Sequence, residues 1–497
     1  MLKNIKIQLL LSLLLVVSYS CTDDEGNYDY KEINEIAVTG IEDSYTVYTG
    51  EYLKITPDLN ATIDDGSNPE RYTYEWVALN PSKLLLESKT IIATTKNFDG
   101  ILKLPPGSYD VYYFIKDNVT GVTWKRKSFD LNVVSSIYEG WLVIGEADGK
   151  ARLDMISILP SIPQPRIITD VLDAAGSALK LSGKPVEVTC LGNALSTTSA
   201  YGIYVTTTEN GTARIDPDSF GWVQSQNLAY ETLGGAFPTN FGIDFMKSPG
   251  GGENFLYSKG NIYYYLRVFN IKYGLPQNIL ETETKTFNAA PFIAENAGYS
   301  IGAPVFFDRD ARRFVRFNYS KGNCSTMPPL VGSPTVLDWN NTNSDLVYMT
   351  TSSYNGIENF AVLKNITTGK YHLLRFTKTL VQNYYKEILN APDFDKATQF
   401  AVSPDSGYLF YVVGNKVYEY DHGTQSAKLM IDKGSEAVTY IGFHSNARNA
   451  DKKLVLGSYG TAGTLELYTV PPVNGDLILT DKFSGLSKIV DVAFRRR

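Results

Sequence analysis

Gly140-Trp-Leu-Val-Ile-Gly145, the turn Asp148-Gly-Lys150 and Ala151-Arg-Leu-Asp-Met-Ile156 form the first of seven similar units in the sequence. Each unit is an apolar run, a short turn and a second run rich in aromatic residues. A turn of this kind between two β-prone runs is a strong short-range signal for a β-hairpin. The other six hairpins are predicted at 201–215, 255–266, 304–317, 360–374, 408–420 and 453–468.

The spacing of these hairpins predicts a β-propeller. They recur about every 45–60 residues, the length that a blade of four strands needs. We therefore expect residues 138–497 to form a propeller of about seven blades. A ring has no free sheet edge only if its ends meet. We expect the last alternating run, Lys488-Ile-Val-Asp-Val-Ala-Phe494, to pair in the same blade as residues 140–157.

A different pattern precedes the propeller. Short alternating runs begin at Ile36, Tyr45, Tyr52, Tyr72, Tyr109 and Phe129, with turns between them. About seven short strands in about 100 residues are typical of an immunoglobulin-like sandwich. We predict such a sandwich over residues 36–135, which makes the whole chain all-β. Trp76, on the third or fourth strand, is expected in its core, and Tyr109 is expected to form a tyrosine corner.

The N-terminus indicates export and a lipid anchor. Lys3 and Lys6 precede an apolar run, Leu9-Leu-Leu-Ser-Leu-Leu-Leu-Val-Val17, which is too short to span a bilayer and fits a signal peptide. Cys21 then follows small residues, as in bacterial lipoproteins. We predict a signal peptide over residues 1–20, a lipidated Cys21 and an acidic tether over residues 21–35. An ordinary secretory signal that ends at a cysteine is the alternative.

Composition excludes some partners. The chain has 497 residues and a net charge of −7, with no basic stripe that could follow a nucleic acid backbone. Its 34 tyrosines and 23 phenylalanines suit exposed sheet faces and rims. Beyond Cys21 the only cysteines are Cys190 and Cys324. They fall in non-adjacent blades, so no disulfide is expected.

Gly26-Asn-Tyr-Asp-Tyr-Lys-Glu-Ile-Asn-Glu-Ile36, leading into Val38-Thr-Gly-Ile41, resembles the opening of the PKD-like family of Bacteroidota lipoproteins. The resemblance covers about residues 18–135, where Pro106-Gly-Ser-Tyr-Asp-Val-Tyr112 matches a strand of PKD domains. Ser403-Pro-Asp-Ser-Gly-Tyr408 resembles the turn of WD40-like repeats. Asp23, Asp24 and Glu25 look like the export signal that brings such lipoproteins to the cell surface; a solvated tether is the alternative.

The resemblance implies an accessory or ligand-binding lipoprotein on the outer face of the outer membrane. Its expected partners are the subunits of a SusC/SusD-type TonB-dependent importer, other surface lipoproteins and a peptide or glycan nutrient. The family offers no site motif that can be placed on this chain, so the ligand-binding residues stay unknown.

The sequence contains no recognisable motif for catalysis, metal binding or cofactor binding. The three histidines, His372, His422 and His444, have no metal-ligand spacing, and no nucleophile elbow or phosphate-binding loop occurs. Asp58-Leu-Asn-Ala-Thr-Ile-Asp64 has the alternating oxygen ligands of a calcium loop but lacks its glycine and its final glutamate. We therefore expect no metal and no cofactor.

Two other functions stay open. A stand-alone glycan-binding module would use exposed Tyr and Trp as stacking platforms. A propeller glycosidase would aim paired carboxylates into the central channel. The carboxylates considered for this role are Asp244, Asp308, Asp338 and Glu358. Nothing in the sequence separates them from ordinary turn carboxylates, and we expect the protein not to be an enzyme.

Overall fold

The computed structural model describes residues 34–496, except 67, 82–88, 127, 160–163, 193–199, 236, 251, 296–302, 330–335 and 448. The chain divides into two compact units, Met1–Ser135 and Ser136–Arg497. The predicted signal peptide, the lipidated Cys21 and the acidic residues Asp23, Asp24 and Glu25 lie outside the described residues. Across the described ranges, no helix has the length and apolarity needed to cross a membrane.

The first unit is an immunoglobulin-like sandwich. Its largest sheet has the strand order β2-β10-β8-β5-β6, with β9 paired to β8, and two strand pairs, β1-β4 and β3-β7, complete it. The strands are β1 (Ile36–Thr39), β2 (Ser44–Tyr48), β3 (Tyr52–Ile55), β4 (Asp58–Ala61), β5 (Tyr72–Leu79), β6 (Lys89–Ala93), β7 (Phe98–Ile101), β8 (Gly107–Asp117), β9 (Thr123–Lys125) and β10 (Phe129–Val134).

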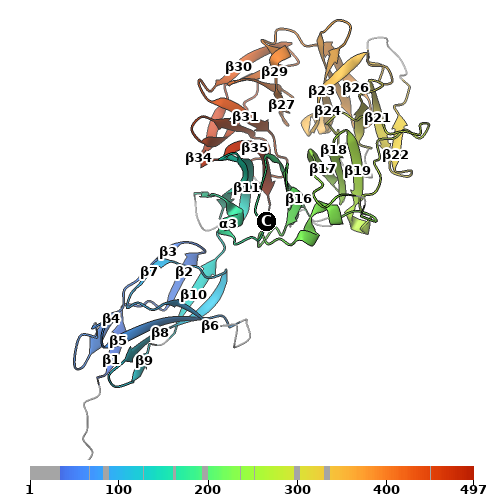
Figure 1. The fold of residues 1–497 in the computed structure, drawn as a ribbon. Helices are drawn as coiled ribbons and strands as arrows, with labels where there is room; N and C mark the ends of the chain where they lie inside the picture. Colours follow the sequence, from blue (N-terminus) through green and yellow to red (C-terminus); the bar gives the residue numbers. More distant parts are fainter. Residues whose placement is uncertain are drawn as a thin grey trace, which may run out of the picture. The chain divides into compact units, whose positions relative to one another are not determined.

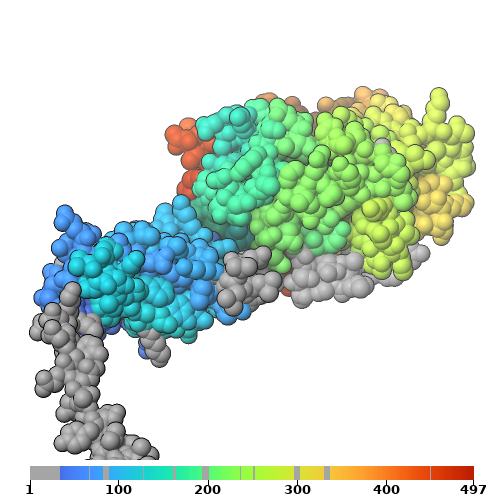
Figure 2. All heavy atoms as spheres, turned by 60° about the horizontal axis from the view of Figure 1, so that its bottom comes forward, coloured from blue at the N-terminus to red at the C-terminus, as the bar shows by residue number. Residues whose placement is uncertain are grey.

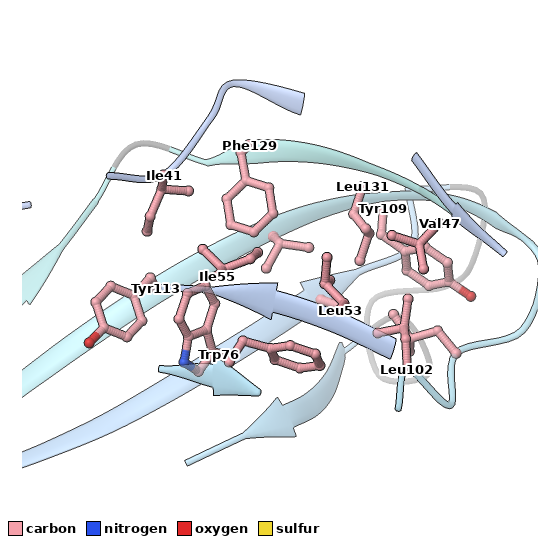
Figure 3. Packing of buried hydrophobic residues seen from close by; sticks show 14 of the residues in the cluster. Ile41, Val47, Leu53, Ile55, Trp76, Leu102, Tyr109, Tyr113, Phe129 and Leu131 are labelled. Carbon is pink, nitrogen blue, oxygen red and sulfur yellow. The ribbon is translucent and has the colours of Figure 1, made fainter. Parts of the chain in front are cut away.

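The core of the sandwich surrounds Trp76, as predicted. The indole is fully buried, lies 4.4 Å from the ring of Tyr113 and donates a hydrogen bond to the carbonyl of Thr95. Figure 3 shows it beside Tyr113 and Phe129 among aliphatic side chains. The Tyr109 hydroxyl donates to the carbonyl of Pro105 at 2.8 Å, which confirms the tyrosine corner. Trp76 lies on the fifth strand, not the third or fourth, because β4 was not predicted.

The calcium-like stretch is a strand followed by an ion pair. Residues 58–61 form β4 and pair with β1. Asp64 accepts hydrogen bonds from the Tyr72 hydroxyl and the Gly66 amide, and its Oδ2 lies 3.1 Å from the Arg71 guanidinium. These contacts hold the pKa of Asp64 below its usual value against the effect of burial. The Arg71 guanidinium therefore supplies the positive charge at the Asp64 carboxylate.

The second unit is a β-propeller (Figure 1). Its described residues contain seven sheets, of orders β13-β12-β11-β35, β14-β15-β16, β17-β18-β19, β20-β21-β22, β23-β24-β25-β26, β27-β28-β29-β30 and β31-β32-β33-β34. We number the blades one to seven in this order.

The strands are β11 (Glu139–Ala147), β12 (Lys150–Ile158), β13 (Arg166–Ile168), β14 (Pro185–Gly192), β15 (Ala200–Thr207), β16 (Gly211–Ile215), β17 (Phe245–Gly250), β18 (Glu253–Ser258), β19 (Asn261–Leu266), β20 (Val305–Asp308), β21 (Arg313–Asn318), β22 (Asn323–Thr326), β23 (Ser344–Ser352), β24 (Glu358–Asn365), β25 (Tyr371–Thr377), β26 (Gln382–Glu387), β27 (Gln399–Val402), β28 (Leu409–Val413), β29 (Lys416–Asp421), β30 (Ser426–Asp432), β31 (Ala437–Gly442), β32 (Leu454–Tyr459), β33 (Gly463–Thr469), β34 (Ile478–Leu486) and β35 (Lys488–Arg495). The short helices are α3 (Val171–Ala174), η1 (Gln224–Gln226), η2 (Leu228–Tyr230), η3 (Arg267–Phe269), η4 (Tyr354–Gly356) and η5 (Phe394–Lys396).

All seven predicted hairpins are present. They are β11-β12, β15-β16, β18-β19, β20-β21, β24-β25, β28-β29 and β32-β33. Gly211 shows why one of the turns needs glycine. Its φ is +70°, and a Cβ there would lie 2.3 Å from the carbonyl oxygen of Asn240. A larger residue would meet both backbone strain and a steric clash.

The ring closes where it was predicted to close. β35 pairs antiparallel with β11, with Val143 opposite Val492 and Trp141 opposite Phe494. Two contacts secure this blade: Asp154 accepts hydrogen bonds from the amide and hydroxyl of Ser487, and buried Arg495 pairs with Asp218 at 2.9 Å. The C-terminal strand therefore completes the blade that β11 begins (Figure 1).

Candidate functional site on the propeller axis

The innermost strands of the blades form the wall around the axis of the ring. They are identified by contacts between neighbouring blades: β35 touches β14 and β31, β27 touches β31 and β23, and β14 touches β17. In the fourth blade the segment 289–294 takes this place, since Ala289 and Ala294 bridge to Asp308 and Val305 of β20.

Two carboxylates bind consecutive inner strands together. Asp491 of β35 accepts a hydrogen bond from the Val188 amide of β14 at 3.0 Å. Glu187 of β14 accepts one from the Met246 amide of β17 at 2.7 Å, and the Thr189 hydroxyl donates to the same oxygen at 2.6 Å. Each carboxylate therefore reaches from its own blade to the backbone of the next.

The electrostatic state of this pair is unusual. Glu187 is only 5% exposed, and its second oxygen, Oε2, has no hydrogen-bond partner. Burial, and next the charge of Asp491, raise the pKa of Glu187 to about 8, while burial raises the pKa of Asp491 to about 6. Both carboxyl groups therefore hold a proton more tightly than an exposed carboxyl group does, and Glu187 does so more than Asp491.

Lys247 of β17 places a positive charge on the same wall. Its ammonium lies 3.8 Å from Glu295 of the fourth blade, and its side chain is 47% exposed. Burial, and then the charge of Lys247, lower the pKa of His444 to about 3. His444 follows β31 in the seventh blade, whereas Lys247 belongs to the third. Since these blades are not neighbours, the two side chains interact across the axis.

The inner segments of blades four to seven carry aromatic side chains, which also pack against the blade cores. Phe292, Tyr348, Phe400 and Tyr440 come from the inner segments of blades four to seven, and each is half-buried. The ring of Tyr348 lies 5.7 Å from Phe292 and stacks on Phe400 at 5.3 Å. The Tyr440 hydroxyl shares a hydrogen bond of 2.9 Å with His444 Nε2.

The axial wall therefore has a charged half, made by Asp491, Glu187, Lys247 and Glu295, and an aromatic half. Asp491 also raises the pKa of Tyr440, after the larger effect of burial, so the two halves meet at the junction of the first and seventh blades. Aromatic faces beside carboxyl groups suit molecules that carry both C–H surfaces and hydroxyl or ammonium donors.

The four carboxylates considered from the sequence do not form this site. Asp244 and Asp308 accept backbone amides at the β18-β19 and β20-β21 turns, and Asp308 also binds the Arg313 guanidinium at 2.8 Å. Asp338 is exposed and accepts the amide of Asn340. Glu358 is buried in an ion pair with Arg375 at 2.8 Å. Their partners are turn amides and arginines, as for the ordinary turn carboxylates from which the sequence did not separate them.

The histidines and cysteines contribute little to the chemistry of this site. His444 alone of the three histidines lies on the axial wall, and burial keeps it neutral. Among the described residues, no group of three or more His, Cys, Asp or Glu side chains can hold a metal ion. Cys190 and Cys324 are both free, and burial raises the pKa of the Cys190 thiol to about 12, which leaves it unreactive near neutral pH.

Sequence reasoning missed Glu187 and Asp491, although a signal exists. Both stand between valines, in Val186-Glu187-Val188 and Val490-Asp491-Val492. A carboxylate inside a β-branched run is unusual for a strand that is buried on both faces. Combined with the predicted ring, that pattern identifies an inner strand with one polar face.

The comparison with protein families supports a PKD-like identity for the first unit in particular. Residues 21–185 match the model of the PKD-like family. The match covers the sandwich and the start of the propeller unit as far as Pro185. No curated protein matches the chain.

Solved structures match large parts of the chain at low sequence identity. A quinonprotein alcohol dehydrogenase-like protein from Bacteroides thetaiotaomicron has 11% identity and a TM-score of 0.47, covering 91% of this chain and 96% of its own. A putative 6-phosphogluconolactonase from Bacteroides uniformis has 12% identity and a TM-score of 0.34, with coverage of 85% and 99%. A xyloglucanase from Xanthomonas campestris has 10% identity and a TM-score of 0.37, with coverage of 70% and 56%. At these values we take no activity or ligand from them.

Proposed function

We propose that the protein is a surface lipoprotein that binds a glycan at the axial wall of its propeller, without transforming it. The observation that carries the proposal is the pairing of a half-buried aromatic arc, Tyr348 with Phe400, and a buried carboxyl group, Glu187, that has an unpartnered oxygen. An unsatisfied buried polar atom is costly, and a ligand hydroxyl group that forms a hydrogen bond with it removes that cost.

A glycan suits both halves of the wall. The C–H face of a sugar ring packs on aromatic rings, and its hydroxyl groups donate to carboxylates and accept from a lysine such as Lys247. A peptide is the other nutrient class that we consider. Its ammonium would pair with Asp491, but it would compete there with the Val188 amide that Asp491 already accepts.

Attachment and partners follow from the N-terminal sequence. We propose that lipidated Cys21 holds the protein on the outer membrane and that Asp23, Asp24 and Glu25 direct it to the outer face of the cell. There it would act as an accessory component of a SusC/SusD-type importer. The match of residues 21–185 to the PKD-like family supports this role. Affinity purification of the native membrane complex tests it, and recovery of the protein without importer subunits would contradict it.

A second candidate function is glycoside hydrolysis, favoured by one observation. Glu187 and Asp491 have pKa values of about 8 and about 6, which would suit an acid and a base near neutral pH. Both carboxylates, however, already accept backbone amides of the next blade. We therefore prefer the binding role. Release of reducing ends from a glycan panel by the wild type, but not by Glu187→Gln, would replace binding with hydrolysis.

Binding is tested by calorimetry against a panel of soluble oligosaccharides and peptides. We expect at least one oligosaccharide to bind, and Tyr348→Ala and Glu187→Gln each to weaken that binding by tenfold or more. Asp244→Asn is the matched control, since this exposed carboxylate accepts the Lys259 amide of the β18-β19 turn and makes none of the contacts of Glu187 or Asp491. Equal binding by all three variants would refute the axial site, and binding of peptides alone would correct the ligand class.

A further inference from the structure

Blades two and three differ from the four-stranded blades of the ring. Each has three strands in the described residues, and β16 and β19 are followed by long connections in place of an outer strand. The two connections are joined: Thr232 bridges Tyr273, the Leu233 amide donates to the carbonyl of Tyr273 at 2.8 Å, and the Tyr273 amide donates to that of Glu231 at 3.1 Å. Together they make one added structure on the side of the propeller.

Buried hydrogen bonds and an ion pair connect this added structure to the strands of blades two and three. The buried carboxylate of Glu231 accepts from the Tyr204 hydroxyl and pairs with Arg214 at 2.8 Å. The Tyr273 hydroxyl accepts from Asn254 at 2.7 Å, and both tyrosines belong to a buried aromatic cluster. The connections are therefore built to present a defined surface.

That surface is apolar. We call it the insertion patch and define it as Tyr230, Leu233, Val268, Phe269, Ile271 and Leu275, all exposed large apolar side chains. Phe269 and Leu275 are 72% and 79% exposed. Leu233 lies against Gly274, and Lys272 donates to the carbonyl of Tyr230, so the two connections contribute to one continuous patch. Figure 2 shows the green segments that follow the second and third blades on the face turned toward the viewer.

The part of the second connection that contributes to the patch carries basic residues and no acidic ones. No Asp or Glu occurs between Asn254 and Leu280, whereas Arg267 and Lys272 lie inside that range. Glu231, on the other connection, is buried and paired with Arg214. Val268 and Phe269 sit in the turn η3, which ends at Asn270 with φ +52°. Exposed aromatic and aliphatic side chains on turns, together with lysine and arginine, are what an interfacial membrane contact requires.

We propose that the insertion patch docks on an anionic lipid surface, with its apolar side chains entering the headgroup region and Arg267 and Lys272 contacting phosphates. A bilayer is close at hand if Cys21 is lipidated as predicted. The segment 22–33 spans about 40 Å at most when fully extended, so the anchor keeps the chain near the membrane. A second contact then needs little affinity of its own, because tethering raises the effective concentration of the surface. The inference is independent of the axial site.

The test uses the full mature chain with Cys21→Ser, so that no lipid is attached. It is sedimented with vesicles of phosphatidylcholine alone and with vesicles that also contain phosphatidylglycerol. We expect binding to the mixed vesicles that falls at high salt, and at least a tenfold loss with the double variant Phe269→Asp, Leu275→Asp. Val473→Asp is the matched control, since this residue is 87% exposed on another connection of the propeller. Thermal melts confirm that each variant is folded.

Two outcomes would overturn the proposal. Absence of vesicle binding by the wild type, or equal binding by the double variant, would remove the lipid surface as the occupant. Sedimentation velocity on the same samples detects the alternative. A dimer that the double variant abolishes, without vesicle binding, would assign the patch to a second copy of this chain.

Discussion

Removal of residues 488–497 should destroy the fold of the propeller rather than one activity. β35 buries Ile489, Val492 and Phe494, each no more than 3% exposed. Burial of such side chains contributes about 1.5–3 kcal/mol each, or about 5–9 kcal/mol together. A domain is stabilised by only about 5–15 kcal/mol in total. The truncated chain also exposes the edge of β11, which favours aggregation.

The assay is expression, size-exclusion chromatography and thermal unfolding of a chain that stops at Ser487. We expect aggregation or loss of the propeller transition while the sandwich transition persists. A chain that lacks only the last two residues, Arg496 and Arg497, is the control and should melt like the full length, because Arg495 keeps its ion pair with Asp218. A Ser487 chain that is soluble, monomeric and melts like the full length would refute the closure argument.

Three further predictions concern single sites. The folded state binds the proton of Glu187 more tightly than the unfolded chain does, so its contribution to stability is full below pH 4.5 and is lost as the pH rises toward about 8. Glu187→Gln should therefore flatten the fall in melting temperature between pH 5 and 8, which calorimetry measures; parallel curves for variant and wild type would contradict this. Tyr109→Phe should cost the sandwich about 1 kcal/mol, measured by denaturant unfolding, and exposed Tyr52→Phe should cost almost nothing. Cys21→Ala should release the protein from the membrane, and a fatty-acid label on this variant would disprove that. Alanine at Asp23, Asp24 and Glu25 should retain lipidation but lower surface display. Full protease accessibility of this second variant on intact cells would contradict the export role.

The sequence was most informative where local rules and ring topology agree. Each hairpin combined a turn signal with two β-prone runs, and both are properties of adjacent residues. The pairing of β35 with β11 followed from the requirement that a ring leave no edge, although the strands are more than 300 residues apart. Because a closed ring requires this pairing, it could be predicted although the two strands are far apart in sequence.

The short strands and the site were not readable in the same way. β4, β6, β7 and β9 have three to five residues each and little alternation, so their strand conformation depends on partners elsewhere in the sandwich. The axial wall is assembled from one or two side chains of each blade, and no two of Glu187, Lys247 and Asp491 are neighbours in sequence. The sequence does not distinguish turn carboxylates such as Asp308 from carboxylates of an inner strand.

Closure by the last strand has a consequence for how the molecule is made. Until Lys488–Arg495 arrives, β11 has a free edge and the first and seventh blades are not joined. On the predicted secretion route, those residues leave the ribosome and cross the inner membrane after all the other propeller strands. The ring therefore cannot close before the other strands have been translocated. A product that ends before Lys488 would keep the edge of β11 open and would present it to other chains during synthesis.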